Sequence, residues 1–241
     1  RHGKRTEAQH APVFERLARF PALGKADLRD HGPDGFLPSS RAIHEGIARG
    51  EIELVQTSGT TSEQVTNTWH QPWWDASERA SWRLNAHAAA ADLGTHREAI
   101  LTSPRSTGVA CEDGYLSMEQ RIRGRFLYLT ERTDASTWTP DHMDRMLREL
   151  AEFAPTALEA NPSFLARLAR HALATGARPR PPELIVLTYE HPSPTQRALI
   201  RRAFASPIAS SYGSTEAGYV FMECERGRMH QVTDCCHVDF L

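Results

Sequence analysis

Short apolar runs alternate with longer amphipathic stretches along most of the chain. The runs typical of buried strands are at residues 98–103 (EAILTS), 125–130 (RFLYLT), 156–160 (TALEA), 183–188 (ELIVLT) and 207–211 (PIASS). The stretches between the later runs have the length and the apolar spacing of helices. Strands that alternate with helices of about 10–15 residues predict an α/β fold with mixed, largely parallel sheets flanked by helices.

Three of the predicted helices share a start signal, at Thr139-Pro140, Asn161-Pro162 and Ser193-Pro194. In each pair, a side chain that can accept a hydrogen bond from a helix amide precedes a proline suited to the first turn. We also predict a long helix over residues 72–94, which open with proline and close with glycine, and short helices over residues 10–20 and 42–49.

Residues 51–57 and 64–69 are typical of two short strands joined as a hairpin, with TSGTT at its tip. The amides and hydroxyls of this loop can surround an anion, and Gly59 allows close approach of the backbone. The loop is not a kinase-type P-loop, because no Gly-Lys-Ser/Thr follows it. A loop of small polar residues is also a common simple turn.

Composition and charge exclude some functions. The chain has 241 residues, a formal net charge of −2 and 40% hydrophobic residues. This balance argues against a nucleic-acid-binding protein, which normally carries a basic excess. Since no apolar run reaches about 18 residues and no signal peptide is recognised, we predict a cytoplasmic protein without membrane association.

A second polar motif, YGSTEAG, follows the run at 207–211 directly. It offers an aromatic ring, two hydroxyls and the carboxylate of Glu216 at a sheet end, where open α/β folds bind ligands. A carboxylate beside phosphate-binding hydroxyls would repel phosphate unless Mg²⁺ lies between them, so Glu216 is a candidate magnesium ligand. A polar loop at a strand end is the alternative.

Together the two motifs resemble the phosphate loop and the Tyr-Gly-x-Thr-Glu signature of the adenylate-forming superfamily, which includes acyl-CoA ligases and adenylation domains. Their separation, about 150 residues, also fits. Three further segments are similar to those of the phenylacetate–CoA ligase branch: FPALGKADLRDHGPDGF, NPSFLARLARHA and FMECERGRMH. The resemblance covers residues 20–241.

The resemblance implies ATP-dependent activation of a carboxylic acid as an acyl-adenylate, with loss of pyrophosphate, and then transfer to CoA, an amine or a carrier protein. It implies phosphate binding by Ser58, Gly59, Thr60 and Thr61. It further implies that Tyr212 stacks on adenine, that Thr215 hydrogen-bonds the α-phosphate and that Glu216 holds Mg²⁺. The remaining residues implied at the nucleotide are Tyr189, Glu190, His191, Ser211, Gly213 and Ser214.

The sequence departs from the family where Ser62, Glu63 and Gln64 replace the usual glycine, basic residue and proline of the phosphate loop. A carboxylate at Glu63 would weaken ATP binding if it faced the phosphates. A non-catalytic relative that binds nucleotide or a partner is therefore the alternative function. Residues 1–241 are expected to form an incomplete N-terminal adenylation domain, without the C-terminal lid domain and its catalytic lysine.

The family's acyl pocket would be lined here by Trp73, Trp74, Trp82, residues 103–115 and residues 209–210. Tryptophans at the start of a helix are more often core residues than the wall of a substrate pocket. The polar run SPRSTGVACEDGY suggests an aryl or small polar acid rather than a fatty chain. A homodimer is left open.

The tail groups Cys224, His230, Cys235, Cys236 and His237 within 14 residues. Four such ligands could form a structural zinc site, with Cys111 as a further candidate. The spacing is not that of a standard zinc finger, and buried cysteines near a turn are the alternative.

Overall fold

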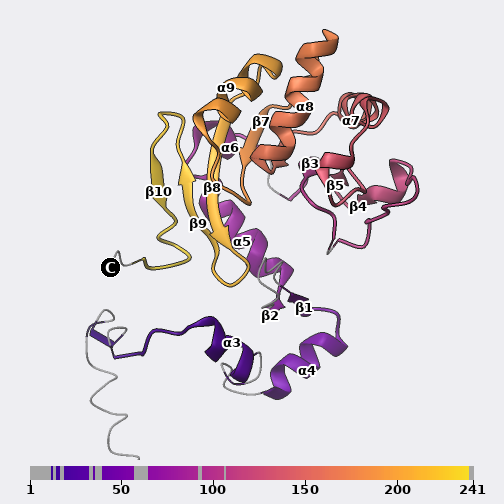
Figure 1. Ribbon diagram of the computed structural model, residues 1–241. Coiled ribbons are helices and arrows are strands. Elements are labelled where there is room, and N and C mark those ends of the chain that lie inside the picture. The colour runs from indigo at the N-terminus through magenta and orange to yellow at the C-terminus, as the bar shows by residue number, and fades with distance from the viewer. Residues whose placement is uncertain are drawn as a thin grey trace, which may run out of the picture. The chain divides into compact units, whose positions relative to one another are not determined.

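The computed structural model describes residues 12, 15–16, 19–32, 35, 40–56, 65–91, 94–105 and 107–238. The chain divides into two compact units, Arg1–Trp69 and His70–Leu241 (Figure 1). Most of the helix expected over residues 10–20 and the whole TSGTT loop with Ser62, Glu63 and Gln64 lie outside the described residues.

The first unit contains α3 (Lys25–His31), α4 (Ser40–Ala48), β1 (Glu53–Gln56) and β2 (Thr66–Trp69). The two strands pair antiparallel, from Glu53 opposite Trp69 to Gln56 opposite Thr66. The predicted hairpin and the predicted helix over residues 42–49 are thus confirmed.

The second unit is built on one sheet of eight strands, in the order β10-β9-β8-β7-β6-β3-β5-β4. The strands are β3 (Glu98–Leu101), β4 (Ile122–Arg123), β5 (Phe126–Tyr128), β6 (Ala157–Ala160), β7 (Leu184–Leu187), β8 (Ile208–Ser214), β9 (Gly218–Glu223) and β10 (Met229–Gln231). Strands β5, β3, β6, β7 and β8 are parallel, whereas β4, β9 and β10 add antiparallel edges. The predicted α/β class with a largely parallel sheet is confirmed.

The three helices with the shared start signal are α7 (Pro140–Phe153), α8 (Pro162–Thr175) and α9 (Pro194–Ala203). The side chains of Thr139, Asn161 and Ser193 each accept a hydrogen bond from an amide of the first turn, as predicted. In Figure 1, α8 and α9 lie against one face of the sheet. Their apolar residues and those of α7 form the larger core with Leu101, Leu158 and Ile185.

The other face of the sheet carries α5 (Gln71–Trp82) and α6 (Ala86–Ala89), with Trp82 and Ala88 in a smaller core. The prediction of one helix over residues 72–94 was wrong. Asn85 interrupts it, because its side chain accepts hydrogen bonds from the amides of His87 and Ala88 and donates to the Glu223 carbonyl at 2.9 Å. A buried amide with these partners favours a new helix start over continuation.

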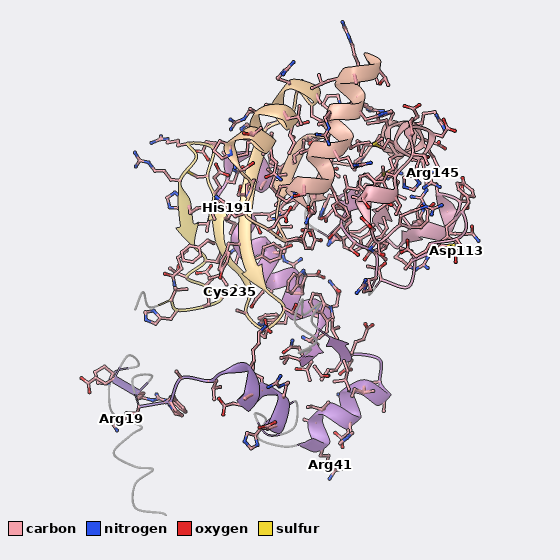
Figure 2. All side chains as sticks on the ribbon, viewed as in Figure 1. Arg19, Arg41, Asp113, Arg145, His191 and Cys235 are labelled. Carbon is pink, nitrogen blue, oxygen red and sulfur yellow. The ribbon has the colours of Figure 1, made fainter. Side chains whose placement is uncertain are left out.

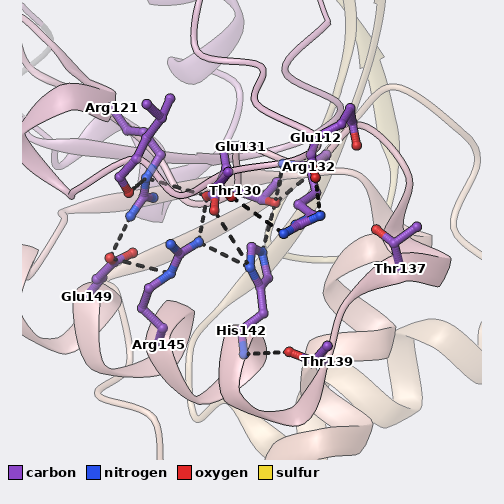
Figure 3. A network of polar contacts seen from close by, with 12 residues as sticks. Glu112, Arg121, Thr130, Glu131, Arg132, Thr137, Thr139, His142, Arg145 and Glu149 are labelled. Atoms are coloured by element: carbon purple, nitrogen blue, oxygen red, sulfur yellow. Dashed lines mark hydrogen bonds and ion pairs between the residues drawn. The ribbon is translucent and has the colours of Figure 1, made fainter.

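A buried network of charges joins α7 to two segments, one before β5 that carries Arg121 and one after β5 that carries Glu131 (Figure 3). Arg121 Nη2 donates to Glu149 Oε1 at 2.5 Å, and Arg145 Nη2 donates to Glu131 Oε2 at 2.5 Å. Burial and the neighbouring Arg145 lower the pKa of His142 to about 4, so this imidazole is neutral in the network at neutral pH. The network fixes one end of the sheet and lies away from β8 and β9.

Candidate functional site

Strands β6, β7 and β8 are parallel, so their carboxyl ends meet at one edge of the sheet. Strand β8 passes at this edge into a tight turn at residues 215–217, and β9 returns antiparallel to it. The Tyr-Gly motif therefore lies where open α/β folds bind ligands, as the sequence predicted.

Two glycines shape this turn. A Cβ on Gly213 would come within 2.2 Å of the Gly218 carbonyl oxygen, so only glycine permits the two strands to approach there. Gly218 has φ +69°, and a Cβ on it would lie 2.6 Å from Ser77 Oγ of α5. The Ala217 amide closes the turn by donating to Ser214, at 3.3 Å to its carbonyl and 3.2 Å to its hydroxyl.

The motif residues are presented differently. Tyr212 is 63% exposed and lies beside Phe221, with ring centroids 6.1 Å apart. Thr215 is half-buried and Glu216 is exposed at the tip of the turn. Ser211 is buried on the opposite face of β8, and its hydroxyl has no hydrogen-bond partner among the described residues. The ring and the carboxylate are thus open to a ligand, while Ser211 faces the core.

Tyr189, Glu190 and His191 follow the end of β7, and their role at the nucleotide stays a prediction. Tyr189 has φ +73°, a conformation that non-glycine residues adopt rarely and that clusters at functional sites. Its hydroxyl donates to Glu159 of β6. Glu190 accepts a hydrogen bond from the Ser163 amide at 3.0 Å and so joins β7 to the start of α8. His191 is exposed beside these strands (Figure 2).

The predicted phosphate loop and the tryptophans of the predicted acyl pocket have different outcomes. Ser58, Gly59, Thr60 and Thr61 lie outside the described residues, so their role stays a prediction. Trp82 is 1% exposed and belongs to the core. Trp74 packs on Tyr219 with centroids 5.1 Å apart, and Trp73 is 41% exposed.

The Cys/His tail does not converge on one point. Cys224 is buried where β9 ends, and its amide donates to the Arg228 carbonyl in the turn that leads to β10. Among the described residues, the one set of three or more metal-ligand side chains within 4.8 Å of one another is elsewhere. The zinc interpretation of Cys224, His230, Cys235 and Cys236 therefore has no support.

That set consists of Glu78 of α5, Glu98 of β3 and Glu159 of β6, between the helix and the sheet. None of the three was predicted as a site residue. Tyr219 Oη donates to Glu159 Oε2 at 3.1 Å and lies within 3.5 Å of Glu78 Oε1. Arg125 Nη2 lies 3.5 Å from Glu78 Oε2. A signal was present, because Glu98 and Glu159 are single carboxylates inside short apolar strands.

Burial is the main cause of perturbed acidity in this cluster. Burial, and then the neighbouring Glu98 and Glu159 carboxylates, raise the pKa of Glu78 to about 8 despite Arg125. Burial and Glu159 hold the pKa of Glu98 well above its ordinary value. Burial also raises the pKa of Glu159, against the hydrogen bonds from Tyr189 and Tyr219. Glu78 therefore keeps its proton at neutral pH.

We expect this cluster to make stability depend on pH. The raised pKa of Glu78 means that folding retains a proton which the unfolded chain loses above about pH 4.5. Stability should therefore fall as pH rises from about 4.5 to about 8, by up to about 1.4 kcal/mol per pH unit from this group. Glu78→Gln should flatten the decline, as measured by urea denaturation at pH 5.5 and pH 8.5.

The exposed glutamate Glu152 of α7 provides the control. Glu152→Gln should leave the dependence on pH as it is in the wild type. An equal decline in wild type and Glu78→Gln would mean that Glu78 is ionised in the folded protein at neutral pH.

No helix among the described residues is both long enough and apolar enough to cross a membrane. No protein-family model matches the chain, and no curated protein matches it.

Solved structures do match. The chain is 18% identical to 2-hydroxyisobutyryl-CoA ligase in complex with 2-HIB-AMP and CoA in the thioesterification state, with a TM-score of 0.59 over 95% of this chain and 48% of that chain. An open conformation of that ligase with the same ligands gives 18% identity and a TM-score of 0.56, over 95% of this chain and 53% of that chain. The same ligase in its postadenylation state with 2-HIB-AMP gives 18% identity and a TM-score of 0.54, over 90% of this chain and 44% of that chain.

The chain spans about half the length of these ligase chains. At 18% identity the likeness establishes the fold, and it covers nearly all of the present chain. This chain therefore shares the fold of these CoA ligase structures over about half of their length, and the assignment of residues 1–241 to an incomplete N-terminal adenylation domain stays a prediction.

Proposed function

We propose that this protein activates a carboxylic acid with ATP, as an acyl-adenylate, and passes the acyl group to a nucleophile. The observation that carries the proposal is the Tyr212–Glu216 stretch at the carboxyl edge of a sheet whose fold matches a CoA ligase holding an acyl-AMP. Because the chain spans about half of that ligase, the activity of the whole protein is part of the proposal.

In the first step a substrate carboxylate oxygen attacks the α-phosphorus of ATP, and the bond to the pyrophosphate oxygen breaks. Catalysis of such a step is mainly positioning and stabilisation of developing charge. Tyr212 would offer its exposed ring to adenine, and Thr215 its half-buried hydroxyl to the α-phosphate. Ser58, Gly59, Thr60 and Thr61 would bind the outer phosphates.

Magnesium fits the residues at the turn. The Glu216 carboxylate is exposed next to the Thr215 hydroxyl, and oxygen atoms of this kind are the ligands that Mg²⁺ prefers. When bound, the ion supplies positive charge to the phosphates. Glu216 would hold it.

In the second step a nucleophile attacks the acyl carbon and AMP leaves. The matched ligase structures contain CoA, which favours CoA as the acceptor; an amine or a carrier protein is the alternative. A small polar acid is proposed as the substrate, since that ligase holds a 2-hydroxyisobutyryl group.

An exchange assay tests the proposal. With the complete protein, ATP and Mg²⁺, labelled pyrophosphate should enter ATP only when the right acid is present, because exchange requires reversible formation of the acyl-adenylate. The acids to compare are 2-hydroxyisobutyrate, lactate, benzoate and phenylacetate, with assays lacking acid as the control.

Absence of exchange with every acid would count against the proposal. If ATP with Mg²⁺ then still raised the melting temperature, the non-catalytic nucleotide-binding alternative would be favoured instead.

A further inference from the structure

The last residues of β8 before the Tyr-Gly motif are held by side chains from two other elements. Glu223, which ends β9, accepts a hydrogen bond from the Ser210 amide at 2.7 Å. Arg197 of α9 donates to both carboxylate oxygens of Glu223, at 2.8 Å each, and to Ser210 Oγ at 2.6 Å. We name Arg197, Ser210 and Glu223 the β8 clamp.

The clamp lies where β8 changes its partner. Up to Ser210, β8 pairs parallel with β7, and from Ser211 onward it pairs antiparallel with β9. The Ser210 amide donates to a carboxylate at this point. On the β7 side Ser210 is held by its pairing with Leu187, whereas on the β9 side the clamp holds it, because the pairing of β8 with β9 begins one residue later.

Tyr212 is the site residue next to the clamp. Residues two apart on a strand point to the same face, so Ser210 and Tyr212 share a face of β8. On β9 the neighbour of Tyr212 is Phe221, which shares its face with Glu223. The Tyr212 ring is therefore two residues along β8 from Ser210, on the same face as the Arg197–Glu223 ion pair.

Thr215 and Glu216 are less closely tied to the clamp. A register shift between Tyr212 and Gly213 separates them from it. The turn that carries them also has its own closing hydrogen bonds, from the Ala217 amide to Ser214.

The chemistry of the clamp favours a fixed geometry. Glu223 is 8% exposed, and the Arg197 side chain is 17% exposed, so both charges are largely removed from water. A guanidinium that donates two parallel hydrogen bonds to a carboxylate fixes distance and orientation together. Lysine has a single ammonium and cannot reproduce that fork.

We propose that Arg197 and Glu223 are positioning residues that place Tyr212 for the nucleotide and thereby set the apparent affinity for ATP. The proposal rests on the proposed function, in which Tyr212 contacts adenine. Neither Arg197 nor Glu223 needs to touch ATP.

The test compares Arg197→Lys and Glu223→Gln with Arg201→Lys and Glu225→Gln in the complete protein. Arg201 is an exposed residue of the same helix, and Glu225 is an exposed carboxylate two residues beyond Glu223. The clamp variants should raise the KM for ATP about 10-fold and change kcat by less than about 3-fold, since small misplacements of binding groups have effects of this order. The control variants should match the wild type.

A purely structural role predicts another pattern. It would lower kcat and the unfolding midpoint through loss of folded protein while the KM for ATP stayed unchanged, and that result would overturn the proposal. Equal effects in clamp and control variants would overturn it too.

A measurement without activity separates this inference from the proposed function. By hydrogen–deuterium exchange, the amides of residues 210–213 should exchange faster in Arg197→Lys than in Arg201→Lys, with amides of α8 unchanged. Unchanged exchange at residues 210–213 would exclude the clamp even if the wild type showed no acid-dependent activity. Conversely, if these amides exchanged hydrogen faster in Arg197→Lys but the wild type showed no acid-dependent activity, the clamp would be supported and only the proposed reaction would be rejected.

Discussion

Replacing Glu216 with alanine is expected to lower acid-dependent pyrophosphate exchange on the order of 100-fold or more, the scale seen when a group that stabilises transition-state charge is removed. Under the proposed function, the Glu216 carboxylate holds the cation that neutralises the phosphates. Glu216→Gln should lose nearly as much, because it keeps the shape of the side chain and removes the charge. Both variants are measured at saturating ATP and acid over a range of Mg²⁺ concentrations.

The exposed position of Glu216 makes this result interpretable. A surface substitution of this kind usually changes stability by less than about 0.5 kcal/mol, so the variants should fold as the wild type does. Glu183→Ala is the matched control, since Glu183 is an exposed glutamate that precedes β7 at the opposite edge of the sheet. Exchange at the wild-type rate in Glu216→Ala would remove Glu216 from its proposed role.

The largest loss of stability is expected from Arg121→Met. Arg121 is 0% exposed, and besides Glu149 it donates to the carbonyls of Leu116 and Tyr128, at 3.2 and 2.7 Å. Methionine fills part of the space but leaves the Glu149 carboxylate and both carbonyls without this donor. Removing one partner of a buried ion pair costs about 3–5 kcal/mol. Urea denaturation followed by tryptophan fluorescence measures this loss.

Arg123 offers a close comparison, because it is exposed two residues away and, among the described residues, donates only to the nearby carbonyls of Gln120 and Ile122. Arg123→Met should change the free energy of unfolding by less than about 0.5 kcal/mol. A double variant, Arg121→Met with Glu149→Leu, should recover part of the loss, since a buried pair replaced by apolar groups is often tolerated. If Arg121→Met and Arg123→Met were equally stable, the network would be solvated and of little energetic weight.

Local signals in the sequence predicted much of this fold. The caps at Thr139, Asn161 and Ser193 were predictable because each depends on hydrogen bonds within one helical turn. The Tyr-Gly motif was predictable for a similar reason, since it follows its strand directly. The break in the helix predicted over residues 72–94 could not be foreseen from the sequence. It depends on Asn85 and a partner 138 residues away, the Glu223 carbonyl.

The remainder of the site depends on contacts between distant elements. Glu78, Glu98 and Glu159 come together only through the pairing of β3 with β6 and the placement of α5 on the sheet. In the C-terminal tail, residues that are close in sequence do not form a site. Four potential ligands, Cys224, His230, Cys235 and Cys236, are close in sequence, but side-chain positions depend on turns and strand faces that the spacing alone does not determine.

The contact of α5 with β9 has a consequence for folding during synthesis. The Tyr219 amide donates to Ser77 Oγ, and the Asn85 amide reaches Glu223, across separations of 142 and 138 residues. At about 5–20 residues per second, the ribosome needs on the order of ten seconds between making α5 and making its partner strand. During that interval Ser77, which is buried in the folded protein, lacks the Tyr219 amide that donates to it, whereas Trp82 can pack on Ala157, Leu184 and Val186 once β6 and β7 are made. The part of α5 that contacts β9 is therefore expected to stay exposed on the nascent chain until β9 has emerged, and to be open to chaperones during that time.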